Sequence, residues 1–509
     1  NVSGKLIHPT AKDSRTIDSR IGGALIHSRN GYSLFRVGSR GNRELLVIRP
    51  DGSWRPLLPV DNGSTTEQGF VVPGHGEPTF LVRSDHLAEH FRLLKVTHTE
   101  HGSSVDVLLE RDDAELEEFA VSTDGSTLAV LWNVQGWCDL EIYRLTPDGV
   151  HLLCAPAMPS LIATEPSLTA DGRFLALGVS GPEFPPSVVL FDVAEQHWVG
   201  EDFSPIASPI GEVVSASLIA EQKLADAPCC INNAPRDQRG NDVLSVWGQA
   251  QIIPQLLHFE ARDGLGLSGW FYHAVGVPDG GVAPTFVYFH GGPEGQSRPD
   301  YNNVLRKVVQ AGYHVFMPNV RGSSGFGRKF SQADDRYARF AAIDDAEDAL
   351  NFLIDQGFTR EGEAVIAGRS YGGFLVHSSL TRHAGRWKGG IAACGMSDLL
   401  TFYRDTDPWI ASAAQPKYGD PNLDTHLLRE ASPLRQLSRV KVPVLFVHGE
   451  LDSNVPVSEA YQAMGVLAGH GIDVELLLFS NEGHVFEKLT NRYDMARRVL
   501  DFCERLFTA

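Results

Sequence analysis

The most constraining feature of this chain is a short turn in which three glycines surround one serine. The stretch AGRSYGGF (residues 367–374) follows an apolar run and sets Gly368, Ser370 and Gly372 in a G-x-S-x-G pattern. That pattern is typical of a sharp strand-to-helix turn whose flanking residues must lack side chains. Because the chain has 50 glycines, a single match could arise by chance in a glycine-rich loop. The apolar run before it and the helical segment after it make a purely structural serine the weaker interpretation.

From about residue 255 onward, strand-like apolar runs alternate with helical segments. NVLRKVVQAGY and AIDDAEDALNFLIDQG have helical periodicity, whereas six runs have the character of buried strands: PTFVYFH, HVFMPNV, EAVIAG, GGIAACG, VPVLFVHG and DVELLLFS. This alternation predicts a mostly parallel, doubly wound sheet with helices on both faces. Such sheets carry their chemistry at the carboxyl ends of the strands. We assign residues 251–509 to this predicted domain.

An acid and a histidine follow Ser370 at the ends of two later strands. A serine hydroxyl is a poor nucleophile unless a base takes its proton. In an α/β-hydrolase the order along the chain is serine, acid, histidine. Asp452 follows VPVLFVHG and His484 follows DVELLLFS, so the three residues predict a catalytic triad. Three other residues are weaker candidates for these roles: Glu450 and Asp398 as the acid, and His448, which we interpret as structural.

The oxyanion formed by attack of Ser370 needs two hydrogen-bond donors. One predicted donor is the backbone N–H of Tyr371, directly after the nucleophile. The second is expected in the turn His290-Gly291-Gly292-Pro293, which follows the strand PTFVYFH. Two glycines there allow the backbone to approach a substrate oxygen closely, although an ordinary tight turn is the alternative.

The N-terminal half has short alternating apolar stretches separated by Asp-Gly turns. Asp124 and Asp171 begin two such turns 47 residues apart, and Asp51 and Asp148 begin two others 97 residues apart. A period of about 45 residues with several short strands per unit is typical of β-propeller blades. We predict an all-β propeller over residues 1–250, with a β-sandwich as the alternative. The repeat fades over residues 85–113 and 211–242, and residues 226–242 have the composition of a loop or linker.

Composition restricts the partners. The formal net charge is −19, which argues against nucleic acid or an anionic membrane surface. No apolar run is long enough to cross a bilayer. The six cysteines lack the C-x-x-C spacing of metal sites and fit scattered core thiols in a reducing cytoplasm, although a trimmed leader would change that location. The chemistry requires no metal or organic cofactor. The sequon at Asn62 is interpreted as a chance match.

Six stretches of the C-terminal half resemble one family of serine peptidases. They are HGGPEGQ, NVRGSSGFGRKF, DDAEDALNFLI, GRSYGGF, SPLRQLSRVKVPVLFVHGELDSNVP and NEGH, and together they cover most of residues 259–506. In order and spacing they resemble the prolyl oligopeptidase family, especially its acylaminoacyl-peptidase and dipeptidyl-peptidase branches. The resemblance implies an α/β-hydrolase domain joined to an N-terminal β-propeller, in agreement with the repeat.

The resemblance also implies roles for further residues. His290 stands where some members carry a tyrosine that completes the oxyanion hole, so the N–H of Gly292 is the favoured donor here. Asn454 matches an asparagine that binds the carbonyl of the residue preceding the cleaved one. Arg321 matches an arginine expected to hold loops near the site or only to satisfy carbonyls. The S1 pocket is implied to be lined by Tyr371, Val455, Met396, Leu399 and Phe402.

The chain also departs from the family pattern. Family propellers usually have seven blades, and residues 1–250, which precede the hydrolase domain, are too few for seven. The propeller is therefore expected to have fewer blades or to lack loops. Glu117-Glu118 lies too close to a blade strand to match the glutamate pair that binds a substrate amine in dipeptidyl peptidases. We therefore predict a serine hydrolase that cleaves short peptides, as an oligopeptidase or exopeptidase. The alternatives are an esterase, amidase or acyl transferase with the same triad, and a non-catalytic binding protein; the sequence leaves homo-oligomerisation open.

Overall fold

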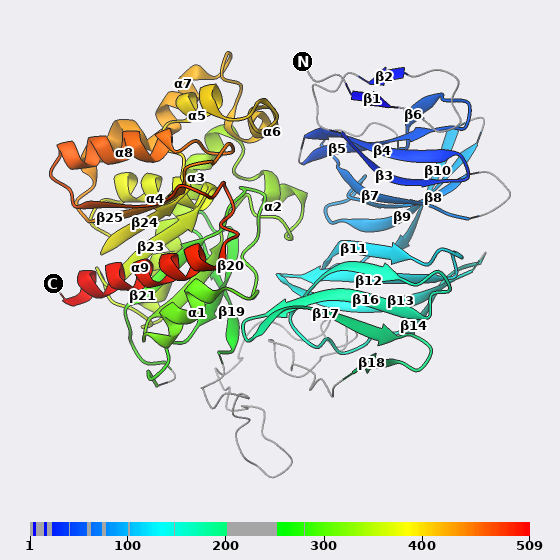
Figure 1. The fold of residues 1–509 in the computed structure, drawn as a ribbon, viewed down its shortest axis with the longest axis horizontal. Helices are drawn as coiled ribbons and strands as arrows, with labels where there is room; N and C mark the ends of the chain where they lie inside the picture. Colours follow the sequence, from blue (N-terminus) through cyan, green and yellow to red (C-terminus); the bar gives the residue numbers. More distant parts are fainter. Residues whose placement is uncertain are drawn as a thin grey trace, which may run out of the picture.

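Two domains lie side by side in the computed structural model (Figure 1). An all-β domain comes first in the chain, and a domain with a central sheet flanked by helices follows it. The predicted domain boundary, the linker-like residues 226–242, the sequon at Asn62 and two of the six cysteines lie outside the described residues. Described are residues 4–6, 15–17, 23–39, 41–58, 63–73, 78–99, 102–146, 148–200, 252–278 and 280–508.

The all-β domain consists of four-stranded antiparallel sheets, each a simple meander, that follow one another as propeller blades (Figure 1). Four such blades lie within the described residues, beside a small pair of strands, β1 (Gly4–Leu6) and β2 (Arg15–Ile17). The blades are β3 (Gly23–Arg29), β4 (Tyr32–Ser39), β5 (Asn42–Ile48) and β6 (Trp54–Pro56); β7 (Thr66–Val71), β8 (Thr79–Ser84), β9 (Arg92–Thr99) and β10 (Gly102–Leu109); β11 (Glu115–Val121), β12 (Thr127–Val134), β13 (Trp137–Thr146) and β14 (Gly149–Cys154); and β15 (Ile162–Leu168), β16 (Phe174–Gly181), β17 (Phe184–Asp192) and β18 (His197–Val199).

The Asp-Gly turns occupy equivalent hairpins, which confirms the propeller and not the sandwich. Asp124 and Asp171 lie in the first hairpin of the third and fourth blades, between β11 and β12 and between β15 and β16. Asp51 and Asp148 lie in the last hairpin of the first and third blades. Residues 85–113 lack the repeat, yet they contain β9 and β10. The second blade is therefore built from strands whose turns use other residues.

The second domain is built on one eight-stranded sheet in the order β19-β20-β22-β21-β23-β24-β25-β26. The strands from β22 to β26 in this order are parallel, and β19 and β20 form an antiparallel edge. Because the parallel strands end at one edge, the residues that follow them are brought together there. The strands are β19 (Pro254–Glu260), β20 (Gly266–Tyr272), β21 (Thr285–Phe289), β22 (His314–Asn319), β23 (Ala364–Arg369), β24 (Gly389–Ala393), β25 (Val444–Gly449) and β26 (Val474–Phe479).

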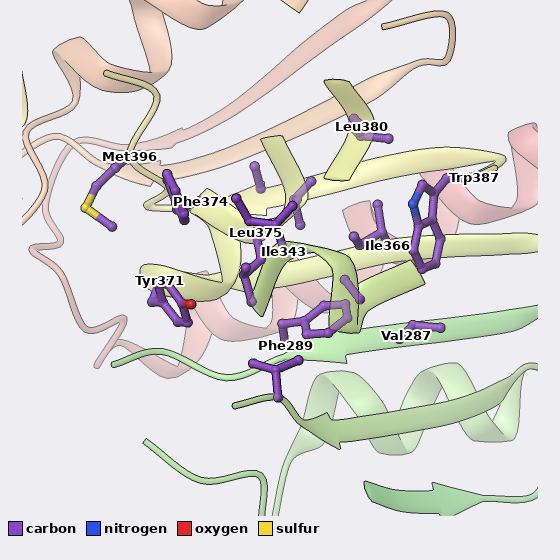
Figure 2. Close-up of a cluster of buried hydrophobic side chains, with 14 of the residues drawn as sticks. Val287, Phe289, Ile343, Ile366, Tyr371, Phe374, Leu375, Leu380, Trp387 and Met396 are labelled. Carbon is purple, nitrogen blue, oxygen red and sulfur yellow. The ribbon is translucent and has the colours of Figure 1, made fainter. Parts of the chain in front are cut away.

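Helices cover both faces of this sheet. α3 (Arg339–Asp355), α4 (Tyr371–Arg382) and α8 (Ser458–Gly469) pack on one face, and α1 (Asn303–Gln310) and α9 (Leu489–Thr508) on the other. Alternate strand residues point to the two faces, so Val287 and Ile366 join the cluster with α3 and α4 (Figure 2). The remaining helices are α2 (Arg328–Gln332), η1 (Arg336–Ala338), α5 (Leu399–Asp405), α6 (Pro408–Tyr418), α7 (Thr425–Ala431) and η2 (Pro433–Arg439).

The two domains contact each other through both apolar and polar groups. Trp137 of the third blade meets Trp270 of β20 edge to face, with ring centroids 6.2 Å apart. The amide of Asn133 donates to Gln296 at 2.7 Å, and Arg298 pairs with Glu117 at 3.1 Å. The third blade is therefore anchored directly to the segment that follows the predicted oxyanion turn. None of the helices in the described part of the chain has the length and apolar character needed to span a membrane.

Candidate active site

Ser370 occupies the sharp turn that the glycine pattern predicts. It directly follows β23 and begins α4, with φ +57° and ψ −115°, a conformation that few residues other than glycine adopt. A side chain on Gly372 would lie 2.1 Å from the carbonyl oxygen of Phe289, and one on Gly368 would lie 2.4 Å from the backbone of Gly372. The glycines are therefore required because strand, turn and helix approach too closely for any Cβ.

Asp452 and His484 form a hydrogen-bonded pair at the ends of β25 and β26. Nδ1 of His484 lies 2.8 Å from Oδ2 of Asp452. The other carboxylate oxygen, Oδ1, accepts the backbone N–H groups of Asn454 and Val455, both at 2.9 Å. Burial alone would raise the pKa of Asp452, but the hydrogen bonds from His448, His484 and the backbone outweigh it and hold that pKa well below its usual range. Asp452 is therefore an ionised carboxylate that orients the imidazole.

Arg369 connects this pair to the nucleophile. It is the last residue of β23, and its Nη2 donates to the backbone carbonyl of His484. The backbone N–H of Ser370 donates to the carbonyl of Ala393 at 2.8 Å, which fixes the turn to the neighbouring strand β24. The loop that carries the histidine is therefore tied to the turn that carries the serine. This contact has no signal in the sequence beyond the position of an arginine beside Ser370.

The other predicted acids have structural roles. Asp398 caps α5 through the backbone N–H of Leu400 at 2.8 Å, and Glu450 is exposed at the end of β25. His448 is buried, with Nε2 2.8 Å from the carbonyl of Val455 and 3.5 Å from Oδ2 of Asp452. The structure thus gives Asp452 alone among these acids a contact with His484, and His448 supports the loop that holds it.

The predicted oxyanion turn lies directly beside the nucleophile. A Cβ on Gly291 would be 3.3 Å from Cβ of Ser370 and 4.0 Å from its Oγ. Gly292 has φ +143°, and a side chain there would collide with the N–H of Gly295 at 2.5 Å. Nδ1 of His290 lies 2.8 Å from the carbonyl of Gly291, and its Nε2 lies 2.8 Å from Oγ of Ser323. Because both ring nitrogens of His290 serve the loop itself, the geometry favours the backbone N–H of Gly292 as the donor.

The residues predicted to line the S1 pocket converge behind the serine. Tyr371, Met396, Leu399, Phe402 and Val455 are all at most 3% exposed and belong to one apolar cluster (Figure 2 shows Tyr371 and Met396). The hydroxyl of Tyr371 donates a hydrogen bond to Oδ2 of Asp334 at 3.2 Å, which fixes the position of the phenol ring. The structure therefore brings these five predicted residues together, and their role as an S1 pocket stays a prediction.

Two further predicted residues, Arg321 and Asn454, have hydrogen-bond partners within the protein. The guanidinium of Arg321 binds Asp345 through Nε and Nη2 and Asp263 through Nη1 and Nη2, at 2.7–3.1 Å. Its donors are thus used to hold the loop after β22, which favours the loop-holding alternative over direct substrate contact. Asn454 lies beside the triad acid, where its backbone carbonyl accepts a hydrogen bond from the hydroxyl of Thr406 at 2.7 Å. Its role toward a substrate carbonyl remains a prediction.

Both glutamates of the pair in the third blade bind other groups of the protein. Glu117 pairs with Arg298, which also donates to the carbonyl of Gly136 at 3.0 Å. Glu118 accepts the backbone N–H of Glu165 at 2.9 Å. The charge of Glu117 is therefore compensated within the protein. This arrangement is consistent with the sequence argument against an amine-binding pair at these positions.

The fold and this arrangement define the class of protein. A serine in a sharp turn, a buried acid and a histidine follow β23, β25 and β26 of one parallel sheet, as in an α/β-hydrolase. Residues 299–509 match the model of the prolyl oligopeptidase family. The match lies within the hydrolase domain and includes Ser370, Asp452 and His484.

Curated relatives are similar to part of this chain. Dipeptidyl aminopeptidase BIII of Pseudoxanthomonas mexicana is 32% identical over 213 residues, covering 41% of this chain and 31% of that protein. Acylamino-acid-releasing enzyme 1 of Oryza sativa subsp. japonica is 28% identical over 224 residues, 42% of this chain and 29% of that protein. The chain thus aligns with about a third of the length of the curated relatives it matches.

Solved structures share the whole fold. A Mycobacterium tuberculosis puromycin-hydrolyzing peptidase superposes with a TM-score of 0.76 at 21% identity, covering 95% of this chain and 69% of that one. An acylaminoacyl peptidase of Pyrococcus horikoshii superposes with a TM-score of 0.69 at 18% identity, covering 97% of this chain and 72% of that one. At these identities the likeness establishes the arrangement of propeller and hydrolase domain.

Proposed function

We propose that this chain is a serine peptidase that cleaves short peptides through an acyl-enzyme on Ser370. The observation that carries the proposal is the hydrogen bond between His484 and the ionised, buried Asp452. Arg369, beside the nucleophile, holds the loop of His484 through a second hydrogen bond. The match of residues 299–509 to the prolyl oligopeptidase family supports peptides as the substrate class. The names of the relatives, dipeptidyl aminopeptidase and acylamino-acid-releasing enzyme, point the same way.

In the proposed reaction each residue has a role that the geometry supports. Because the Nδ1–H group of His484 donates a hydrogen bond to Asp452, Nε2 carries the lone pair that accepts the proton of Ser370. Oγ of Ser370 then attacks the acyl carbon, and the N–H groups of Gly292 and Tyr371 stabilise the oxyanion. His484 next gives its proton to the leaving amine. Water, activated by the same imidazole, hydrolyses the acyl-enzyme and restores Ser370.

The propeller domain limits which substrates reach the serine. The third blade contacts the hydrolase domain next to the oxyanion turn, through the bond of Asn133 to Gln296 and the pair of Glu117 with Arg298. The side chain of Glu115 also accepts the backbone N–H of Gly327 at 2.9 Å. Contacts this close to the site favour short or flexible peptides over folded proteins.

Charge around the site bears on the amino terminus of the substrate. Dipeptidyl-peptidase-like recognition needs an uncompensated acid for a free amine, and here Arg298 neutralises Glu117. We therefore propose that acylated or longer peptides are cleaved at least as well as free-amine dipeptides. We also propose a cytoplasmic location, supported by the free thiols of the four cysteines in the described residues.

The test is kcat/KM on four matched substrates that share one P1 residue. They are a free-amine dipeptidyl anilide, an N-acylated aminoacyl anilide, a longer blocked peptide and a simple aryl ester, each repeated with Ser370→Ala. Fast anilide cleavage that requires Ser370 supports a peptidase. Ester turnover without anilide cleavage would instead support the esterase, amidase or transferase alternative. Failure of a fluorophosphonate to label Ser370 would support a non-catalytic binding protein.

A further inference from the structure

Cys394 lies beside two members of the triad, Asp452 and His484, although the proposed reaction does not use it. It follows β24, the strand between β23, which leads to the serine, and β25, which leads to the acid. Its side chain is fully buried, and its φ of +47° is a conformation that L residues rarely adopt. The N–H of Cys394 donates to the carbonyl of Val447 at 2.9 Å. The backbone therefore holds the thiol at one defined place.

The thiol of Cys394 completes a set of three metal-binding groups. Its Sγ, a carboxylate oxygen of Asp452 and a ring nitrogen of His484 all lie within 4.8 Å of one another. Thiolate, carboxylate and imidazole are the ligands of Zn²⁺ in proteins, at about 2.0–2.3 Å from the ion, and three of them leave the fourth tetrahedral position open. We propose that Cys394, Asp452 and His484 form an inhibitory binding site for Zn²⁺.

Charge explains why the ion would stabilise this set. A coordinating Zn²⁺ removes the proton of the Cys394 thiol and places two positive charges between the thiolate and the carboxylate. The complex of ion, thiolate, carboxylate and neutral imidazole is uncharged, which suits a largely buried site.

The same coordination stops the proposed reaction. Nδ1 of His484 faces Asp452 and would be the ligating nitrogen, so its proton must move to Nε2. With Nε2 protonated, the imidazole has no lone pair to accept the proton of Ser370. One Zn²⁺ is bound and one proton, that of the thiol, is released to solvent. The ion acts as an inhibitor, and the proposed peptidase reaction does not require it.

The first experiment measures binding without turnover, in Ser370→Ala, which keeps all three ligands. Metal-free protein is titrated with Co²⁺, whose thiolate complexes have a near-ultraviolet charge-transfer band, and the bound Co²⁺ is then displaced with Zn²⁺. We expect the band to appear, to vanish when Cys394→Ser is added to Ser370→Ala, and to persist when Cys154→Ala is added instead. Cys154 is a thiol of β14 in the propeller. No band at saturating Co²⁺, or a band that survives Cys394→Ser, would overturn the proposal.

The second experiment measures inhibition on the substrate that the enzyme cleaves best. Removing an outer partner of a zinc ligand costs about 10–100-fold in affinity, so loss of a ligand should cost at least as much. The Zn²⁺ concentration for half inhibition should therefore rise at least tenfold in Cys394→Ala and in Cys394→Ser, each compared with its own metal-free activity. Equal inhibition of wild type and both variants would contradict the site. Because the cobalt titration needs no activity, its outcome is independent of the proposed peptidase function.

Discussion

The guanidinium of Arg369 donates a hydrogen bond to the backbone carbonyl of His484, so the residue before the nucleophile holds the loop that carries the general base. The two residues are 115 positions apart in the chain: Arg369 is the last residue of β23, and His484 lies in the loop after β26. Asp452 fixes the orientation of the imidazole ring, whereas Arg369 fixes the position of its backbone. A triad needs both, because proton transfer depends on the distance between the imidazole and the serine.

Arg369→Met should therefore lower kcat while leaving KM nearly unchanged. Methionine keeps much of the apolar stem but removes the donor, and a displacement of about 1 Å can reduce a rate about 100-fold. The measurement is kcat and KM on the best anilide, together with the rate at which a fluorophosphonate labels Ser370. Arg382→Met is the control, since Arg382 lies at the end of α4 and pairs with Asp344 at the surface. Equal activity of Arg369→Met and wild type would show that the loop does not need this bond.

His290 offers a test of which group donates to the oxyanion. If the ring only positions the turn, Ser323→Ala should lower kcat as well, because Oγ of Ser323 lies 2.8 Å from Nε2 of His290. We expect a loss of about 100-fold for His290→Ala, comparable to removing one oxyanion donor, and a smaller loss for Ser323→Ala. Both are measured as kcat on anilide and ester substrates. A large effect of His290→Ala with none for Ser323→Ala would identify the imidazole as a direct donor.

Much of the site could be predicted because each residue follows its own apolar strand. Ser370 comes directly after β23, Asp452 and His484 lie in the loops that follow β25 and β26, and parallel strands end at one edge of the sheet. The glycines around Ser370 were equally informative, since each is required by a backbone contact. The Asp-Gly turns indicated the blades for a similar reason, because a tight hairpin limits which residues fit.

Side-chain partners across the sheet could not be predicted in this way. Arg321 matched a family position, but its bonds to Asp263, in the turn after β19, and to Asp345 of α3 join it to residues 58 and 24 positions away in the chain. Cys394 had no ligand spacing in the sequence, because its two partners follow other strands. A pattern along the chain shows which residues reach the edge of the sheet, whereas their contacts there depend on loop conformation.

Substitution of Glu117, which pairs with Arg298, can distinguish a role in stability from a role in substrate recognition. Their side chains are 25% and 16% exposed, so Glu117→Gln leaves a largely buried arginine without its counter-charge. We expect the free energy of unfolding to fall by about 3–5 kcal/mol, measured by urea denaturation. The ratio of kcat/KM for free-amine and acylated anilides should stay within about twofold of wild type, since uniform binding losses cancel in that ratio. A selective loss on the free-amine substrate would assign Glu117 to amine recognition instead.

Asp85 of the second blade should make the stability of the protein depend on pH. It is only 3% exposed, and its Oδ1 accepts the backbone N–H of Thr65 at 2.5 Å. Burial raises the pKa of Asp85 to about 6, from 3.8 for the free group, against the smaller opposing effects of that bond and of Arg328. The folded state therefore keeps this proton to a higher pH than the unfolded state does. The contribution of Asp85 to stability should fall as pH rises from about 4 to about 6 and should be level above that.

Asp85→Asn keeps an acceptor for Thr65 and removes the charge. The difference in unfolding free energy between Asp85→Asn and wild type should therefore grow in favour of the variant, by at most about 2 kcal/mol between pH 4 and pH 7.5. Urea denaturation at several pH values measures it, with Asp106→Asn, an exposed acid of β10, as the control. A difference that does not change with pH would mean that Asp85 titrates alike in the folded and unfolded states. In that case the hydrogen bond from Thr65 would already compensate its burial.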